Sequence, residues 1–254
     1  MFTLERQTAF SATHLGSQNS SSTNSKITED SNQLSVICLR PGVVCSVGRK
    51  PDCTLTTSDP SVSRRHAEIT LQKANDEYPK VILKDTSAYG TSVTRAGEKQ
   101  KEKQSTRELL DGDFVCFGAT ERFLLIWRPL KIACTMLTLE DKQRLCTIIQ
   151  GDFCGHMKPD CTPDITHLCS QGAMISSKLI LALVYGIPIV TPKFFNDLNE
   201  WSKNFDKLSR PLEKNYCPVS NDSEITRTKY GLLKHENRRT VFANMLFLFP
   251  SETT

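Results

Sequence analysis

Three polar clusters between residues 47 and 91 constrain this chain more than any other feature. The clusters are Gly48-Arg49-Lys50, Ser63-Arg64-Arg65-His66 and Asp85-Thr86-Ser87-Ala88-Tyr89-Gly90-Thr91. Short apolar segments lie beside them, at 43–47, 67–71 and 81–83. This order predicts three loops at one end of an antiparallel β-stack, where loops can meet at one ligand. Guanidinium groups, hydroxyls and backbone amides with only one carboxylate nearby suit a phosphate.

Composition limits the classes of protein to which the chain can belong. A length of 254 residues predicts two domains, and a net charge of only +4 gives no reason to expect direct DNA binding. The first residues lack the features of a signal peptide, and no apolar stretch approaches the length that spans a membrane. We therefore expect a soluble, intracellular protein without membrane contact. The ten cysteines contain no C-x-x-C pair, which favours free thiols.

The first half of the chain has the rhythm of a β-sandwich. Short apolar strands recur between residues 34 and 127, among them one at 114–117, with turn residues between them. We expect residues 34–47 to form a hairpin around Pro41-Gly42, and the charged run 95–108 to be a solvated hairpin loop. The Ser-, Thr- and Asn-rich stretch 11–32 has almost no large apolar residue, so we expect a disordered insertion there.

After Trp127-Arg128-Pro129 the pattern changes to alternating strands and helices, which marks a domain boundary. Strands are expected at 132–134, 153–157, 167–169 and 187–190. Helices are expected at 139–150, 177–185 and 192–201, the first two ended by Gly151 and Gly186. This order predicts a small parallel sheet flanked by helices. Residues 202–239 are charged and poorly periodic, which predicts a linker, and 241–249 is a strongly apolar strand-like run.

The three clusters resemble the signature of forkhead-associated (FHA) domains, which bind phosphothreonine peptides. The resemblance rests on Gly48-Arg49, Ser63-x-x-His66 and Asp85-x-Ser87-x-x-Gly90-Thr91. It implies that Arg49, Ser63 and Arg64 bind the phosphate and that His66 braces the loops. The pocket support and peptide wall would come from Gly48, Ser87, Tyr89, Gly90 and Thr91.

One position departs from the common FHA pattern. Most FHA domains have Asn before Gly-Thr, where its amide reads the peptide backbone, whereas this chain has Tyr89. The preceding Ala88 also lacks a charge that could reach the phosphate. The resemblance therefore implies phosphate binding and leaves the contact with the peptide backbone in question.

Residues 131–201 resemble a BRCT domain, through Thr166-His167-Leu168, Gly186-Ile187-Pro188 and the terminal helix carrying Trp201. In tandem BRCT repeats a Ser or Thr and a Lys hold a phosphoserine, which implies a second phosphate pocket at Thr135 and Lys178. The expected fold is thus an all-β FHA sandwich (1–128), an α/β BRCT domain (131–201), a linker (202–239) and the first strand of a truncated second BRCT repeat (240–254).

Other chemistries are less well supported by the sequence. Cys154, His156, Cys161, His167 and Cys169 could supply zinc ligands, but alternation on buried strands explains them more simply. No nucleophile elbow, phosphate-binding P-loop or His-Glu-x-x-His motif is present. We expect no metal, no cofactor and no enzymatic activity.

An FHA domain followed by a BRCT domain is similar to the adaptor subunits of double-strand-break repair nuclease complexes. That resemblance implies a nuclear adaptor in the cell-cycle checkpoint and DNA-damage response. Its partners would be phosphorylated damage-response proteins, and nuclease subunits bound through segments absent from this chain. The alternatives are a regulatory fragment of a DNA-end-processing enzyme or kinase, and an interaction module that does not depend on phosphate.

Overall fold

The computed structural model describes residues 1–7, 36–73, 78–219 and 240. The predicted insertion 11–32, the second half of the predicted linker (220–239) and the predicted strand at 241–249 lie outside these residues. The chain divides into two compact units. Unit 1 contains Met1–Pro129 together with Asp152–Cys154 and Glu200–Ser209, and the described part of unit 2 contains 130–151, 155–199 and 210–219.

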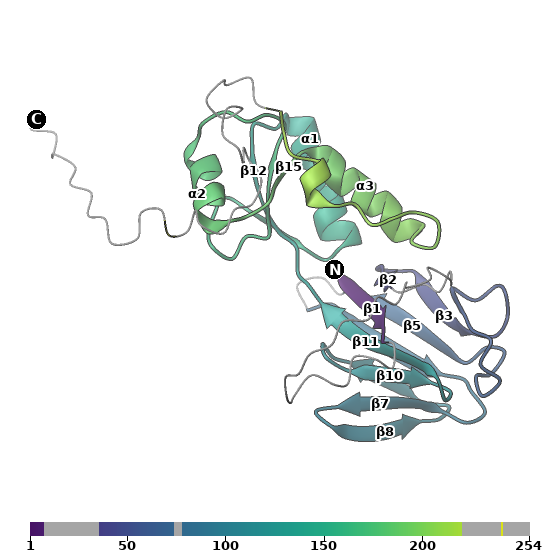
Figure 1. The fold of residues 1–254 in the computed structure, drawn as a ribbon. Helices are drawn as coiled ribbons and strands as arrows, with labels where there is room; N and C mark the ends of the chain where they lie inside the picture. Colours follow the sequence, from purple (N-terminus) through teal and green to yellow (C-terminus); the bar gives the residue numbers. More distant parts are fainter. Residues whose placement is uncertain (8–35, 74–77, 220–239, 241–254) are drawn as a thin grey trace, which may run out of the picture. The chain divides into compact units, whose positions relative to one another are not determined.

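Unit 1 is a sandwich of two β-sheets (Figure 1). The described strands of the first sheet are ordered β2-β1-β11-β10-β7-β8. Their bounds are β1 Phe2–Arg6, β2 Val36–Leu39, β7 Thr91–Arg95, β8 Glu98–Glu102, β10 Phe114–Phe117 and β11 Glu121–Trp127. The second sheet is ordered β4-β3-β5-β6-β9. Its strands are β3 Val44–Gly48, β4 Leu55–Thr56, β5 Ala67–Gln72, β6 Lys80–Asp85 and β9 Thr106–Leu109.

Alternating side chains form the core between the two sheets. Leu4, Ile69, Leu83, Val93 and Phe123 are completely buried there, and in β5, β6, β7 and β11 the residues on either side of them are more exposed. Among the described strand pairs of unit 1, β3 and β4 run parallel and the others are antiparallel. The core therefore fixes the register of each strand, and with it the position of the loops at the strand ends.

Two predictions for unit 1 need correction. β2 and β3 do not form a hairpin, because β2 pairs with β1 while β3 pairs with β5 in the other sheet. The turn at Pro41-Gly42 carries the chain between the sheets. The charged run 95–108 does begin with the exposed hairpin β7–β8, but its last residues form β9, which pairs with β6.

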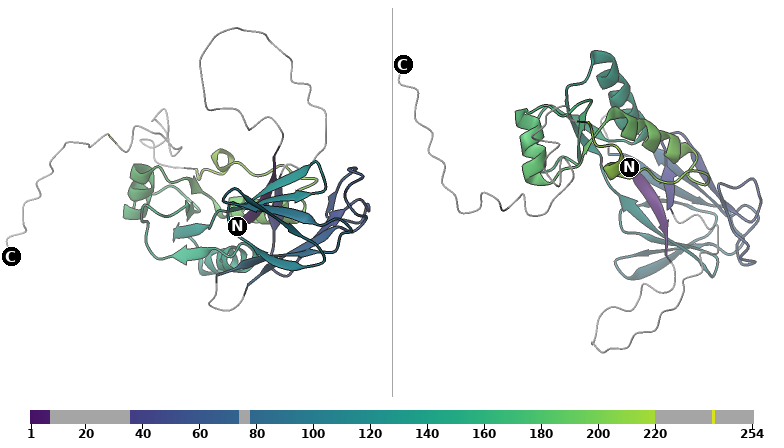
Figure 2. Two further views of the ribbon diagram at one scale, coloured as in Figure 1. Left: turned by 90° about the horizontal axis from the view of Figure 1, so that it is seen from below. Right: turned by 45° about the horizontal axis from the view of Figure 1, so that its top comes forward.

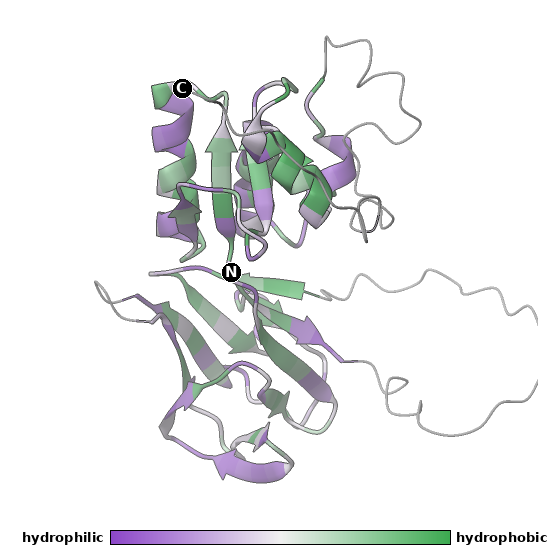
Figure 3. Ribbon diagram, turned by 90° about the vertical axis from the view of Figure 1, so that its left-hand side faces the viewer, coloured by the Kyte–Doolittle hydropathy of each residue, from purple (hydrophilic) through white to green (hydrophobic). Residues whose placement is uncertain are grey.

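Unit 2 is a four-stranded parallel sheet with helices on both faces. The order of the described strands is β13-β12-β14-β15. Their bounds are β12 Lys131–Thr135, β13 His156–Lys158, β14 His167–Ser170 and β15 Ile189–Val190. The helix α2 (Ser177–Tyr185) covers one face, and α1 (Leu139–Cys146) and α3 (Pro192–Lys203) cover the other (Figures 1 and 2). Figure 3 shows mainly hydrophobic strands between helices that carry both hydrophobic and hydrophilic turns.

Two further predictions differ from the structure of unit 2. Gly151 does not end the first helix, because α1 continues into a π-helical segment, η2 (Thr147–Asp152). The predicted linker begins inside α3, and its described part contains the short helix η3 (Glu213–Asn215). Tyr216 then packs on unit 2: its carbonyl accepts the Thr191 N–H at 2.8 Å, and its hydroxyl donates to Asp197 at 2.8 Å. The fold class, a β-sandwich followed by an α/β domain with a small parallel sheet, is confirmed.

Candidate functional site

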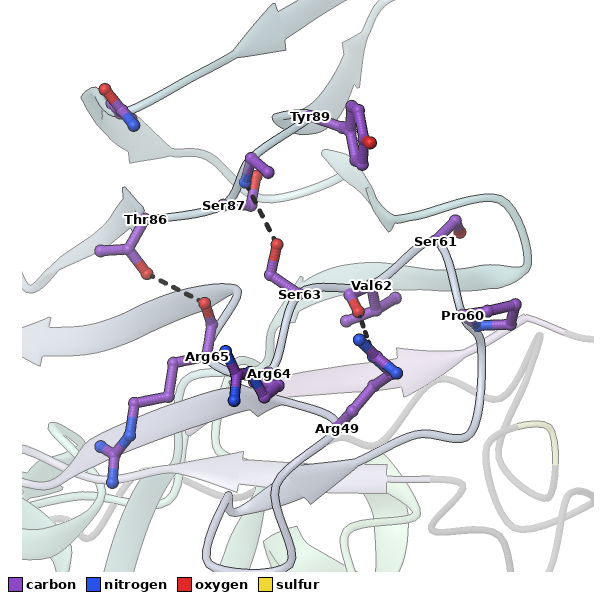
Figure 4. Close-up of a pocket in the computed structure, with 12 residues that line it drawn as sticks. Arg49, Pro60, Ser61, Val62, Ser63, Arg64, Arg65, Thr86, Ser87 and Tyr89 are labelled. Atoms are coloured by element: carbon purple, nitrogen blue, oxygen red, sulfur yellow. Dashed lines mark hydrogen bonds between the residues drawn. The ribbon is translucent and has the colours of Figure 1, made fainter.

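A pocket of about 490 Å³ opens at one end of the unit 1 sandwich (Figure 4). Its walls come from the residue after β3, from the β4–β5 loop, from the β6–β7 loop and from one residue of the β8–β9 loop. The lining residues are Arg49, Pro60, Ser61, Val62, Ser63, Arg64, Arg65, Thr86, Ser87, Ala88, Tyr89 and Gln104. Three of them are arginines and none is acidic, so the pocket favours an anion.

Arg49 is fixed to the β4–β5 loop by its backbone and by its side chain. Its backbone N–H donates to the Ser63 carbonyl at 3.2 Å, and its Nε donates to the Val62 carbonyl at 2.6 Å. Figure 4 shows the guanidinium held against Val62 in this way. The two terminal NH₂ groups have no partner among the described residues, so they remain available to a ligand.

Position 48 must be a glycine because the end of β3 passes very close to the backbone of the β4–β5 loop. A Cβ atom at Gly48 would lie 2.3 Å from the Arg64 carbonyl oxygen, well inside van der Waals contact. The close approach lets the Lys50 N–H donate to that same carbonyl at 3.1 Å. Gly48 therefore positions the Arg49 backbone and does not line the pocket itself.

Ser63 and Arg64 both present unused donors in the pocket. The Ser63 Oγ accepts the Ala88 N–H at 3.1 Å, which joins two loops and leaves the hydroxyl hydrogen free to donate. Arg64 is exposed, and no described residue forms a hydrogen bond or ion pair with its guanidinium. Arg65 differs, because its guanidinium pairs with Asp52 at 2.6 Å.

His66 lies behind the pocket and is completely buried. Its Nδ1 accepts the Ser63 N–H at 3.0 Å, so the ring carries its proton on Nε2. Burial lowers the pKa of His66, against the opposing effect of the Asp85 carboxylate 3.9 Å from Nε2. A neutral imidazole therefore holds the backbone of Ser63.

Asp85 organises the third loop. Its carboxylate accepts the Ser87 N–H at 3.1 Å, the Thr91 hydroxyl at 2.6 Å and the Gln104 N–H at 3.0 Å. The Ser87 hydroxyl also donates to Asp85 and accepts the Gly90 N–H at 2.7 Å. Ser87 and Thr91 are completely buried, so their hydroxyls shape the loop.

Of the residues predicted to form the peptide wall, Tyr89 is the one whose side chain is freely exposed, at 72%. It lines the pocket beside Ser87. Gly90 and Thr91 do not line the pocket. Gly90 has φ +88°, and a Cβ there would lie 2.5 Å from the Glu102 carbonyl oxygen, so a side chain would disturb the β7–β8 pair.

The structure adds residues that sequence reasoning missed. Asp59 is buried and accepts hydrogen bonds from Ser61 and Thr120, which hold its pKa well below the usual range and tie the β4–β5 loop to the β10–β11 turn. The pattern Asp-x-Ser at 59–61, typical of an Asx turn, was the available signal. Gln104 also lines the pocket, and no motif pointed to it.

The residues of the predicted second pocket lie at the carboxyl end of β12 and in the first turn of α2. Thr135 ends β12 and is half-buried. The Lys178 ammonium donates to the Cys134 carbonyl at 3.2 Å and the Pro159 carbonyl at 2.5 Å. Lys178 thus already bonds two backbone oxygens, and phosphate binding at this place stays a prediction.

The described residues also bear on metal binding, disulfides and membrane insertion. Within the described ranges no group of three or more His, Cys, Asp or Glu side chains is placed to hold a metal ion. All ten cysteines are described, and none of them forms a disulfide. None of the described helices has the length and apolar character needed to cross a membrane.

Comparison with known proteins identifies the first domain. The FHA domain family matches residues 45–118. This span contains Arg49, the β4–β5 loop, the β6–β7 loop and Gln104, and so includes every residue that lines the pocket.

Longer relatives extend over both units. The chain is 30% identical to nibrin from Gallus gallus over 210 residues, which is 80% of this chain and 27% of that protein. It is 32% identical to nibrin from Danio rerio over 217 residues, which is 85% of this chain and 25% of that protein. The chain therefore spans about a quarter of the length of these relatives.

Solved structures support the same arrangement of elements. The FHA/BRCT-repeat domain of S. pombe Nbs1 superimposes with a TM-score of 0.58 at 14% identity, covering 85% of this chain and 64% of that one. The S. pombe Nbs1 FHA-BRCT1-BRCT2 domains give a TM-score of 0.58 at 16% identity, covering 85% and 66%. At this level of identity the likeness concerns the fold.

Proposed function

Since this chain is a nibrin homologue with an FHA domain and a BRCT domain, we propose that it is a phosphothreonine-peptide-binding adaptor. The observation that supports this function best is the set of unused donors in the unit 1 pocket. They are the two NH₂ groups of Arg49, the hydroxyl hydrogen of Ser63 and the guanidinium of Arg64, in a pocket with no acidic lining residue.

The chemistry of a phosphothreonine matches these donors. At neutral pH its phosphate carries about −1.5 to −2 charges and three acceptor oxygens. Hydrogen bonds to charged groups contribute about 1.5–3 kcal/mol each. Less of this free energy is lost on binding when the donors are already fixed, because fewer side chains have to be ordered. Arg49 is fixed by Val62, and Ser63 by His66 and Ala88, so little ordering remains to be done on binding.

The biological role follows from the relatives and is part of the proposal. We propose that the chain acts in the nucleus, recognises phosphothreonine motifs on DNA-damage-response proteins and helps to localise a double-strand-break repair nuclease. A solved structure of S. pombe Nbs1 is a complex with Ctp1, which supports partner recognition by a protein of this fold. The role is binding and recruitment, without catalysis.

Removing the Arg49 guanidinium tests this function. A degenerate peptide mixture with a fixed phosphothreonine would first select a well-bound sequence, which is then titrated with and without its phosphate. Arg49→Ala should weaken binding of the phosphorylated peptide between about tenfold and a hundredfold, because it removes a charge-assisted contact. Lys99→Ala is the matched control, since it removes one positive charge from the exposed strand β8, outside the pocket.

Two results would contradict the proposal. The first is equal affinity of the wild-type protein for the phosphorylated and unphosphorylated peptides. The second is an Arg49→Ala variant that folds normally and binds the phosphopeptide as tightly as Lys99→Ala does.

A further inference from the structure

Gln104 is the one pocket residue that comes from the β8–β9 loop, and its side-chain amide has no partner among the described residues. We infer that Gln104 hydrogen-bonds a backbone peptide group of the bound phosphopeptide and so helps to set which peptide sequences fit. This inference rests on the proposed function, because it concerns the same ligand. It adds a contact to the peptide chain, separate from the contact to the phosphate.

The backbone of Gln104 is fixed by the third loop of the pocket. Its N–H donates to the Asp85 carboxylate at 3.0 Å, and the following residue, Ser105, accepts the Asp85 N–H at 2.9 Å through its carbonyl. The same carboxylate holds Ser87 and Thr91. The β8–β9 loop and the β6–β7 loop are therefore joined as one wall of the pocket.

Gln104 also has an unusual backbone conformation. Its φ is +50°, in the left-handed region, which costs energy for a residue with a long side chain. Such strain persists only where surrounding contacts enforce it, and here Asp85 provides them.

The side chain has the right chemistry for a peptide group. Gln104 is the only carboxamide among the lining residues of the described pocket, and it is exposed. A carboxamide offers one acceptor and two donors in a plane, which can pair with the N–H or C=O of an extended peptide. The other polar side chains of the lining are hydroxyls, guanidinium groups and the Tyr89 phenol, none of which places a donor and an acceptor side by side in one plane.

The position of Gln104 separates this contact from the phosphate. Figure 4 shows Ser63 between Arg49 on one side and Thr86 and Ser87 on the other. Gln104 is bonded to Asp85, directly before Thr86. A peptide with its phosphate at Arg49 and Ser63 would thus have a neighbouring backbone segment near Thr86 and Gln104.

The test combines a substitution with a scan of the ligand backbone. The selected phosphothreonine peptide is prepared with each peptide bond near the phosphothreonine replaced in turn by an ester, which removes one N–H and weakens one carbonyl acceptor. Gln104→Ala should lower affinity for the all-amide peptide between about twofold and tenfold. For one ester analogue, wild-type and Gln104→Ala proteins should bind equally, because the contact is already lost. Gln72→Ala, at the exposed end of β5 and outside the pocket, is the matched control.

The outcomes distinguish this inference from the proposed function. Unchanged affinity in Gln104→Ala, together with weak binding by Arg49→Ala, overturns the role of Gln104 alone. The inference is also overturned if Gln104→Ala lowers the affinity for every ester analogue by the same factor. A purely structural effect on the loop would lower all of these affinities together. Unchanged affinity in Arg49→Ala would instead overturn phosphate recognition.

Discussion

The neutral state of His66 makes the folding stability of unit 1 depend on pH. The imidazole accepts the Ser63 N–H, and protonation would place a second N–H against that donor. Burial lowers the pKa of His66 in the folded protein, whereas the unfolded chain titrates near 6.5. The unfolded state therefore takes up the proton first as the pH falls, and the stability given by neutral His66 is lost below about pH 6.5.

We predict that the free energy of unfolding of unit 1 falls as the pH decreases from 6.5, and that His66→Gln reduces this slope. Gln offers an acceptor for the Ser63 N–H without titrating. Denaturant unfolding at a series of pH values measures the difference between the two proteins, so other titrating groups cancel. His156→Gln, which changes an exposed histidine in β13 of unit 2, is the matched control. An identical slope in His66→Gln would show that His66 does not titrate in this range.

At the level of elements, the sequence predicted strands and helices better than their partners. The strand at 114–117 and the helix at 177–185 have the expected bounds, because alternation and capping residues are local signals. The hairpin predicted at 34–47 was wrong because strand pairing depends on residues far apart in the sequence. A turn at Pro41-Gly42 can close a hairpin or lead the chain into the other sheet. The outcome depends on the pairing of β2 with β1 and of β3 with β5, which are not neighbouring segments.

The candidate site shows the same division. Arg49, Ser63 and Arg64 belong to a motif with fixed order, so their convergence was expected, and the structure brings all three into the pocket lining. Their roles toward a phosphate remain predictions. Gln104 could not be found in this way, because it reaches the pocket through a hydrogen bond to Asp85, nineteen residues earlier.

Two glycines that follow similar helical patterns differ in the structure. Gly186 ends α2 with φ +66°, in the left-handed region, and its N–H bonds the preceding turn. Gly151 lies inside η2, and a Cβ there would meet no atom within 4 Å. Both glycines were expected to end a helix, and the backbone conformation separates them.

We predict that Gly186→Ala destabilises unit 2 by about 1 kcal/mol, because alanine resists the left-handed conformation. Gly151→Ala should be neutral or stabilise the unit by about 0.5–1 kcal/mol, since alanine loses less entropy than glycine in a helix. Denaturant unfolding of both variants provides the comparison, and each serves as the control for the other. Equal destabilisation by the two substitutions would contradict the distinction drawn from the structure.

For the molecule as a whole, the small net charge and the cationic pocket are compatible. The chain carries 32 basic and 28 acidic side chains, yet the lining of the pocket contains three arginines and no acid. A partner is thus selected by a local charge, and long-range attraction to any polyanion is weak. A ligand at such a site also stabilises the folded protein, because it binds the native state and not the unfolded chain.

This linkage gives a prediction for the folded chain. Phosphopeptide at a hundred times its dissociation constant should raise the free energy of global opening of unit 1 by about 2.7 kcal/mol. Hydrogen exchange at core amides that open only on unfolding, such as those of Ile69 and Leu83, should then slow by about a hundredfold. At the same phosphopeptide concentration the Arg49→Ala variant should show only about twofold to elevenfold protection, because its affinity is about tenfold to a hundredfold lower. The unphosphorylated peptide should give wild-type exchange rates close to those of the free protein. Unchanged exchange at these core amides in the presence of saturating phosphopeptide would contradict preferential binding of the ligand to the native state of unit 1.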